Sequence, residues 1–152
     1  ATKKQLGQNL MKALNEKGPV HAVEFCNVQA MPITSKMEDK YQASIKRASD
    51  KPRNPKNKAT PKEEEYIQIY KNQLAKGEKT KPILDKTDEG FDFYYPIVTN
   101  DMCLKCHGDV NSDIQPETYK TISLKYPEDM AVGYDVNQVR GMWHIEFQKG
   151  NQ

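Results

Sequence analysis

The sequence predicts an α+β fold in a single domain that spans residues 1–152. Apolar residues recur at helical spacing in the first third of the chain, whereas later segments show short extended runs separated by loops of hairpin length. Helices and strands are therefore segregated and do not alternate as in βαβ units, which favours an antiparallel sheet with flanking helices at the N-terminus. A length of 152 residues is also typical of one domain.

Two consecutive helices are expected first. The first carries leucines spaced four residues apart: Leu6, Leu10 and Leu14. Gly18 and Pro19 end this helix, and Pro19 suits the first turn of the second one. The apolar residues of the second helix keep the same spacing: Ala22, Val23, Cys26 and Ala30. Pro32 is expected to end it, and Cys26 is expected to face the interior.

Residues 42–47 are expected to form a short strand that leads into a loop at 50–60 rich in Pro, Asn and Lys. The next helix has a clear start, because Thr60 and Glu63 form a capping-box pattern with a proline at the first helical position. It is expected to end at Gly77, and its apolar stripe consists of Tyr66, Tyr70 and Leu74.

Two hairpins are expected after this helix. The paired segments and their loops are 83–84 with 91–98 around 87–90, and 130–135 with 142–147 around 136–141. Strict alternation in the last segment places Trp143, Ile145 and Phe147 on one face, which we expect to face the core. His144 and Glu146 lie on the opposite face, together with Met142, and this face is expected to be solvated.

Composition restricts the classes of function. Twenty-three basic and 21 acidic residues give a net charge of +2 and a pI near 8.4, too mild for the clustered basic face of a nucleic-acid-binding protein. No apolar run approaches the ~18–20 residues of a membrane span. The hydrophobic fraction is 36% and the mean hydropathy is −0.90, so the side chains alone supply a thin core.

Cys103, Cys106 and His107 form a C-x-x-C-H motif. Two thiols about one helical turn apart can add to the vinyl groups at one edge of a haem, and the adjacent histidine then reaches the iron as an axial ligand. A zinc site would need further Cys or His pairs, and a thioredoxin-type pair would need a βαβ setting; neither context is present. The motif therefore predicts one covalent haem c, which would also complete the thin core.

The expected location follows from this chemistry. Thioether attachment of haem implies assembly outside the cytoplasm. A chain that starts at Ala1 without a charged and apolar leader fits a product from which a signal peptide was removed. We therefore expect a periplasmic protein.

The second axial ligand is the open question of this site. The candidate side chains are His21, His144, Met11, Met31, Met37, Met102, Met130, Met142 and Cys26. Met102 is too close to the attachment site to reach the far face of the ring, and both histidines are interpreted as surface groups. A lone thiol is a liability in an oxidising compartment, whereas ferric iron binds thiolate well, so Cys26 is favoured.

Five segments resemble motifs of the DUF3365 family of c-type haem-binding domains. They are GPVHAVEFCN at 18–27, RNPKN at 53–57, CLKCHG at 103–108, YPEDMAVGY at 126–134 and RGMW at 140–143. The resemblance spans nearly the whole chain and implies a PAS-like antiparallel sheet with flanking helices, and a His/Cys axial pair carried here by His107 and Cys26. Residues 136–139 depart from the family's usual Gly-Asp before Arg-Gly, and the family's acid-plus-Trp helix start after the Arg-Asn-Pro loop is missing.

Haem propionates need cationic or hydrogen-bonding partners, and a guanidinium offers two parallel donors that lysine lacks. The chain has only three arginines: Arg47, Arg53 and Arg140. Arg53 and Arg140 fall within the segments that resemble the family, so each is a candidate propionate partner. A turn-stabilising or surface role is the alternative for both.

The expected function is a haem-based redox or diatomic-gas sensor with NO or CO as the ligand. The chain as given holds no kinase or other output domain, so a sensor would act through a signalling or redox partner that the sequence does not identify. A soluble electron-transfer cytochrome c is the alternative, and it would keep both axial ligands in both oxidation states. A peroxidase or other enzyme is disfavoured, because only His21 offers a distal acid or base.

Overall fold

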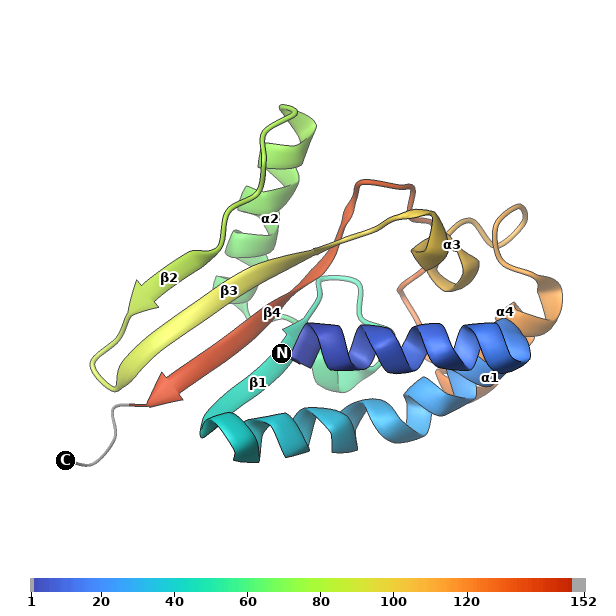
Figure 1. Ribbon diagram of the computed structural model, residues 1–152. Helices are drawn as coiled ribbons and strands as arrows, with labels where there is room; N and C mark the ends of the chain where they lie inside the picture. The colour runs from blue at the N-terminus through green and yellow to red at the C-terminus, as the bar shows by residue number, and fades with distance from the viewer. Residues whose placement is uncertain (1, 149–152) are drawn as a thin grey trace.

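The computed structural model describes residues 2–148, and it places helices on both sides of one sheet (Figure 1). In chain order the elements are α1 (Thr2–Tyr41), β1 (Ala43–Ala48), the 3₁₀ helix η1 (Pro55–Asn57), α2 (Pro61–Ala75), β2 (Ile83–Lys86), β3 (Gly90–Val98), α3 (Asp101–His107), α4 (Pro116–Lys125) and β4 (Val139–Gln148). The strand order is β1-β4-β3-β2, and all neighbours are antiparallel. The predicted α+β class is confirmed.

Helix α1 consists of two helices that meet at Gly18. This residue has φ 78° and ψ −176°, a conformation that glycine adopts without the steric cost of a Cβ. Figure 1 shows the two halves of α1 lying side by side and running in opposite directions on one side of the sheet. The predicted break at Gly18 is therefore confirmed.

The predicted end of the second half at Pro32 is wrong, because α1 continues to Tyr41. A proline inside a helix removes one backbone hydrogen bond and costs about 3 kcal/mol. The turns beyond the proline are held by tertiary packing, since Met37 is buried against Ile45 of β1 and Trp143 of β4. Burial of this apolar face outweighs the local helix-breaking signal.

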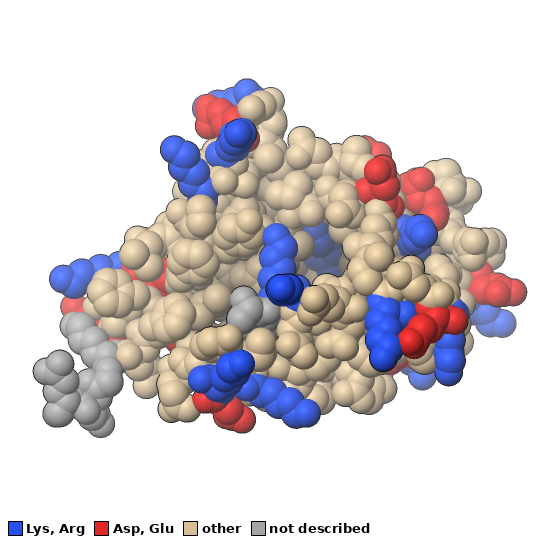
Figure 2. Space-filling view, in the orientation of Figure 1, with Lys and Arg blue, Asp and Glu red and all other residues tan. Residues whose placement is uncertain are grey.

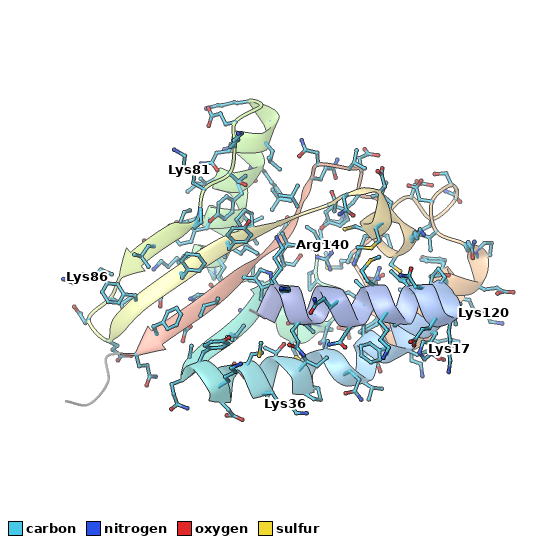
Figure 3. The ribbon with its side chains drawn as sticks, in the orientation of Figure 1. Lys17, Lys36, Lys81, Lys86, Lys120 and Arg140 are labelled. Atoms are coloured by element: carbon cyan, nitrogen blue, oxygen red, sulfur yellow. The ribbon has the colours of Figure 1, made fainter. Side chains whose placement is uncertain are left out.

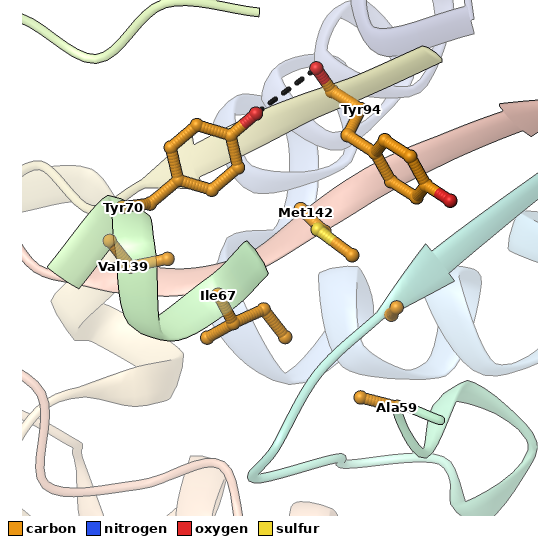
Figure 4. Packing of buried hydrophobic residues seen from close by; sticks show 7 residues of the cluster. Ala59, Ile67, Tyr70, Tyr94, Val139 and Met142 are labelled. Atoms are coloured by element: carbon orange, nitrogen blue, oxygen red, sulfur yellow. Dashed lines mark hydrogen bonds between the residues drawn. The ribbon is translucent and has the colours of Figure 1, made fainter. Parts of the chain in front are cut away.

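Each face of the sheet is covered in part by a different helix. Helix α2 covers the face shown in Figure 4, where the Tyr70 hydroxyl donates a hydrogen bond to the Tyr94 carbonyl oxygen at 3.2 Å. The buried residues of this cluster are Ala48, Ala59, Ile67, Tyr70, Tyr94, Val139 and Met142. Helix α1 packs on the opposite face, which leaves the sheet with no fully solvated side.

The prediction that Met142 and His144 face solvent is therefore wrong. Met142 is fully buried beneath α2, and the His144 ring stacks on Tyr94 with 4.5 Å between ring centroids. Trp143 on the other face is buried as predicted, whereas Phe147 on that same face is 43% exposed. Alternation correctly separates the two faces of β4, but it does not show how many of them another element covers.

The hairpin of β2 and β3 is confirmed, and the predicted second hairpin is wrong. Residues 130–135 are irregular, and β4 pairs with β1 and β3 instead. Helix α4 was not predicted, although Pro116 at its first position and the buried pair Thr118 and Ile122 are helical signals. This unpredicted helix packs against α1 through a cluster that contains Val23 and Ile122.

The surface charge is mixed. On the face shown in Figure 2, basic and acidic side chains are scattered around the molecule, and the surface is hollowed near its centre. Comparison with Figure 1 places this hollow between β3, the first half of α1 and α3. Within residues 2–148, no helix combines the length and the apolar character that a membrane crossing requires.

Candidate functional site

Helix α3 carries the whole C-x-x-C-H motif. The Asn100 side chain caps its first turn and accepts a hydrogen bond from the Cys103 backbone amide at 3.2 Å. The helix ends after His107, and a Cβ atom on Gly108 would lie 2.8 Å from the backbone carbonyl oxygen of Leu104, so this tight exit favours glycine. The result is a short helix that presents Cys103 and Cys106 about one turn apart.

The His107 imidazole is oriented by the backbone. Its Nδ1 lies 2.7 Å from the Ala131 carbonyl oxygen, and because a carbonyl only accepts, Nδ1 carries the proton and Nε2 keeps its lone pair. Nε of Arg140 lies 3.3 Å from the same Nδ1, but two donors cannot form a hydrogen bond with each other. Burial, followed by the charges of Arg53 and Arg140, holds the pKa of His107 well below its usual value, so the ring is neutral.

The segment that was predicted as a strand, residues 130–135, performs this orientation. The Tyr134 amide donates to the His107 carbonyl oxygen at 2.9 Å, and the Gly133 amide donates to the Gly108 carbonyl oxygen at 2.8 Å. His107 Nδ1 also donates to the Ala131 carbonyl oxygen. In a strand, these backbone groups would have formed hydrogen bonds with a neighbouring strand. The segment is therefore irregular because it is bonded to the end of α3.

Arg53 connects the same parts of the site. Its Nε and Nη2 donate to the two carboxylate oxygens of Asp129, each at 3.1 Å, and Nη2 also donates to the carbonyl oxygens of Cys106 and Ala131 at 2.6 and 3.1 Å. The two side chains of this ion pair are only 12% and 8% exposed. Arg53 thereby fixes the last turn of α3 relative to the residue that orients His107.

A first cavity, here called the apolar cavity, lies between α1 and α3. Both halves of α1 line it, with Leu10 and Leu14 from the first half and Val23 and Cys26 from the second. The other lining residues are Ala22, Arg53, Met102, Cys103, Cys106, His107 and Tyr126. The two thiols of the motif, the motif histidine and Cys26 therefore face one largely apolar space.

A second cavity, here called the arginine cavity, adjoins the first. All three arginines of the chain line it, namely Arg47, Arg53 and Arg140. Its other lining residues are Cys26, Asn27, Ala30, Met31, Asn54, Asn57, His107 and Tyr126. Figure 3 shows Arg140 between the sheet and α1, near sulfur atoms at α3. The site thus has an apolar half and a cationic half.

Cys26 lines both cavities and is a free thiol. Burial raises its pKa, and the positive charges of Arg47 and Arg53 partly oppose this effect. Burial also raises the pKa of Cys106, whose electrostatic neighbours include Arg53 and Cys26. Both thiols are therefore protonated at neutral pH in the absence of a ligand to the sulfur. A thiolate at Cys26 would be stabilised by the guanidinium groups of Arg47 and Arg53.

Each predicted site residue lines at least one of the two cavities. Cys26, Arg53 and His107 line both, whereas Cys103 and Cys106 line the apolar cavity and Arg140 the arginine cavity. Sequence reasoning did not place three residues that the structure adds, which are Arg47, Asn27 and Tyr126. The scarcity of arginine was the one available signal for Arg47.

The other candidate axial ligands are divided between the cavities and the rest of the fold. Met102 lines the apolar cavity and Met31 the arginine cavity. His144 lies on the α2 side of the sheet, where its Nδ1 is 2.8 Å from Glu63 Oε1, and Met142 is buried on that side too. In the described residues 2–148, no group of three or more His, Cys, Asp and Glu side chains is arranged to hold a metal ion.

A family model described as Tll0287-like matches residues 1–147 of the sequence. The chain belongs to the Tll0287-like family. This is the DUF3365 family that the five sequence motifs resemble. The match spans α1 to β4, so it includes both cavities and all of the residues predicted for the site.

Among solved structures, the cyanobacterial heme protein Tll0287 has the same fold. Its crystal structure superposes with a TM-score of 0.74 over 99% of this chain and 92% of that chain, at 20% sequence identity. Comparison with curated proteins finds no match. At this identity the structural likeness establishes the fold, while the function is argued from the residues of the site.

Proposed function

We propose that this chain binds one haem covalently and acts as a redox or diatomic-gas sensor, with NO or CO as the gas. The observation that carries the proposal is the pair of adjoining cavities, both lined by His107 and Cys26. A haem is divided in the same way, because its ring is apolar and its two propionates are anionic. Tll0287, which has the same fold, is itself a heme protein.

The thiols of Cys103 and Cys106 would hold the haem from α3. In each attachment the thiol sulfur and its hydrogen add across one vinyl double bond, so no oxidant is needed. His107 would offer Nε2 to the iron, because the Ala131 carbonyl holds the proton on Nδ1. Cys26 would offer its sulfur to the iron from the wall formed by α1.

The arginine cavity fits the propionates. Arg140 lines this cavity, and its Nη1 donates to the Ser49 hydroxyl and the Lys51 carbonyl oxygen, at 2.7 and 3.1 Å, which fixes the position of its guanidinium. Arg53 is already bonded to Asp129, so it acts as a positioning residue for α3 as well as a cation of the cavity. We propose Arg53 and Arg140 as propionate partners and add Arg47 as a third.

A bound haem supplies one-electron redox chemistry and an iron coordination position for NO or CO. The protein's part is to let Cys26 approach or leave that position. Cys26 belongs to the half of α1 that follows the Gly18 break and leads directly into β1. Its displacement would therefore be passed to the edge of the sheet, which is a suitable readout in a PAS-like fold.

The sensor proposal carries two further parts. Haem attachment through thioethers would require assembly outside the cytoplasm, so we propose that the protein is periplasmic. A signalling or redox protein partner would then receive the displacement of α1 and β1. We propose this binding role for the chain in preference to an enzymatic one.

Covalent attachment is tested by acid and organic extraction of protein made in cells that mature c-type cytochromes. We expect the colour to stay with the polypeptide and the mass to rise by that of one haem. Replacing Cys103 and Cys106 together by serine should release the colour into the solvent. Colour lost from the unaltered protein, or a colourless protein that carries zinc, would contradict the proposal.

The axial role of Cys26 is tested by Cys26→Ser, with Met31→Leu as the matched control on the same helix. Optical and electron paramagnetic resonance spectra of the ferric protein should change for Cys26→Ser and stay unchanged for Met31→Leu. The reverse pattern would assign the second axial position to methionine. Spectra unchanged in both variants would exclude both residues.

Mixing the dithionite-reduced protein with CO separates a sensor from the electron carrier. CO binding in the reduced state, with the oxidised state resistant to added ligands, is expected for a sensor in which Cys26 leaves the site on reduction. Refusal of CO near neutral pH, with unchanged ligation in both oxidation states, would favour the alternative function of electron-transfer cytochrome c.

A further inference from the structure

A groove on the α1 side of the sheet lies apart from the site described above. Residues of β1, β3 and β4 line it together with Lys3 and Tyr41 from the two ends of α1, and its volume is about 330 Å³. Five aromatic residues form most of its wall: Tyr41, Phe93, Tyr95, Trp143 and Phe147. It shares no lining residue with the apolar cavity or the arginine cavity.

The groove is apolar yet open. Phe147 and Tyr41 are each 43% exposed, so the sheet presents aromatic surface there that α1 does not cover. At the base Trp143 is only 6% exposed, and its buried Nε1 has no hydrogen-bond partner within the described residues. The base of the groove therefore holds a buried polar group without a partner.

The charge at the groove has one sign. Lys3 supplies the single charged side chain among the described residues that line it, and no carboxylate does so. The Lys3 ammonium lies 4.7 Å from the centre of the Tyr95 ring, at the edge of the aromatic wall. A ligand with one anionic group could therefore place its apolar part on the aromatic wall and its charge beside Lys3.

We propose that this groove binds a small planar aromatic carboxylate. The volume matches a molecule of one or two fused rings, since ligand pockets of roughly 300 Å³ lie at the small end of the observed range. Aromatic walls favour offset or edge-to-face ring contacts. The carboxylate pairs with Lys3 at the edge of the aromatic wall.

The groove also has a contact with the haem site. Arg47 and Trp143 are cross-strand partners of β1 and β4, and the Arg47 guanidinium lies 5.9 Å from the Trp143 ring centre. Arg47 lines the arginine cavity, whereas Trp143 lines the groove. The groove and the proposed haem site are therefore adjacent, and one pair of side chains joins them. Binding in the groove does not itself require the proposed haem.

The test titrates the holoprotein with 1-naphthoate and, as a neutral probe of similar shape, 1-naphthalenemethanol. Trp143 is the only tryptophan, so a single ¹⁵N-labelled indole resonance reports the groove. We expect 1-naphthoate to shift this resonance in a saturable way. Calorimetry should show Lys3→Gln weakening 1-naphthoate by about fivefold, as for one exposed charge pair, with 1-naphthalenemethanol little changed.

Lys4→Gln is the matched control, because Lys4 neighbours Lys3 in sequence but does not line the groove. It should leave the affinity for 1-naphthoate unchanged. Equal effects of the two lysine variants, or an indole resonance that never shifts, would overturn the proposal. A concentration-dependent dimer in sedimentation whose formation prevents both probes from binding would identify the groove as an interface between copies of the chain, and would also overturn it.

Discussion

Glu63 is a buried carboxylate held by three donors. Its Oε2 accepts from Lys46 Nζ and from the Thr60 backbone amide, both at 2.7 Å, and its Oε1 lies 2.8 Å from His144 Nδ1. Burial alone would raise the pKa of Glu63, but the hydrogen bonds from His144, Lys46 and Thr60 outweigh burial and lower it from 4.5 to about 2. The ionised form of Glu63 therefore stabilises the folded state.

Glu63→Gln should lower the free energy of unfolding at pH 7 by an amount on the order of 3 kcal/mol, the equivalent of this pKa shift. In the unaltered protein this contribution is present above pH 4.5 and is lost as the pH falls towards 2, because the folded-state pKa lies below the unfolded-state value. Urea unfolding between pH 2 and 7 measures both effects. The exposed Glu65→Gln is the control, and parallel pH profiles for Glu63→Gln and the unaltered protein would refute the prediction.

Arg53 and Asp129 should behave as one unit. Lysine at position 53 cannot pair with both carboxylate oxygens and two carbonyl groups at once, so Arg53→Lys should cost about 2–3 kcal/mol of stability. Asp129→Asn should cost a similar amount, and the double variant little more than either, which gives a coupling energy above about 1 kcal/mol. Denaturant unfolding of the four proteins measures this coupling. Additive losses would show that the two side chains act independently.

At the scale of elements, the two glycines of α1 have opposite roles. Gly18 occupies a positive φ at the break, so Gly18→Ala should destabilise the fold by about 1 kcal/mol. Gly7 lies inside the first half of α1, where an added Cβ would contact nothing within 4 Å, so Gly7→Ala should stabilise by about 0.5–1 kcal/mol. Thermal unfolding of the pair measures the contrast. Stabilisation by Gly18→Ala would show that the break is not required.

Elements with a local chemical signal could be predicted from the sequence. The capping box of Thr60 and Glu63 is present as expected, and the break at Gly18 follows from its conformational freedom. The continuation of α1 past Pro32 could not be predicted, because it depends on the contact of Met37 with distant strands. Segment 130–135 was mistaken for a strand because its hydrogen-bond partner is the end of α3.

The candidate site likewise combines residues with a local signal and residues without one. A contiguous motif pointed to Cys103, Cys106 and His107, and the spacing of an apolar stripe predicted that Cys26 faces the interior. The convergence of arginines from β1, from the loop before η1 and from β4 on one cavity depends on sheet pairing that no local pattern encodes.

At the scale of the whole molecule, the buried apolar residues of the described chain form three clusters of unequal size. The cluster under α2 has seven buried residues on a continuous sheet, whereas the cluster between α1 and α4 has only three: Val23, Ile114 and Ile122. The cavities adjoin this α1–α4 cluster, since Cys106 and Tyr126 pack against it and line the apolar cavity. A haem bound there would supply much of the apolar contact at that end.

Protein made without haem should therefore loosen at one end only. Amides of α3 and α4 should exchange with solvent much faster than in the holoprotein, while amides of α2, β3 and β4 should keep their protection. Hydrogen exchange followed by mass spectrometry on both forms measures the difference. Uniform loss of protection would show that the molecule depends on haem as a whole, and unchanged protection of α3 would contradict its dependence on the cofactor.

Cys26 and His107 face the same cavities although 81 positions separate them in the chain. With both side chains bound to one iron, the metal would crosslink the chain across a loop of that length. Closing such a loop lowers the conformational entropy of the unfolded ensemble, which raises the free energy of unfolding by about 4.5 kcal/mol. A thiolate that leaves on reduction would open this loop. The oxidised protein would then melt about 10 °C above the reduced protein, so the oxidation state of the iron would set the temperature at which the chain unfolds.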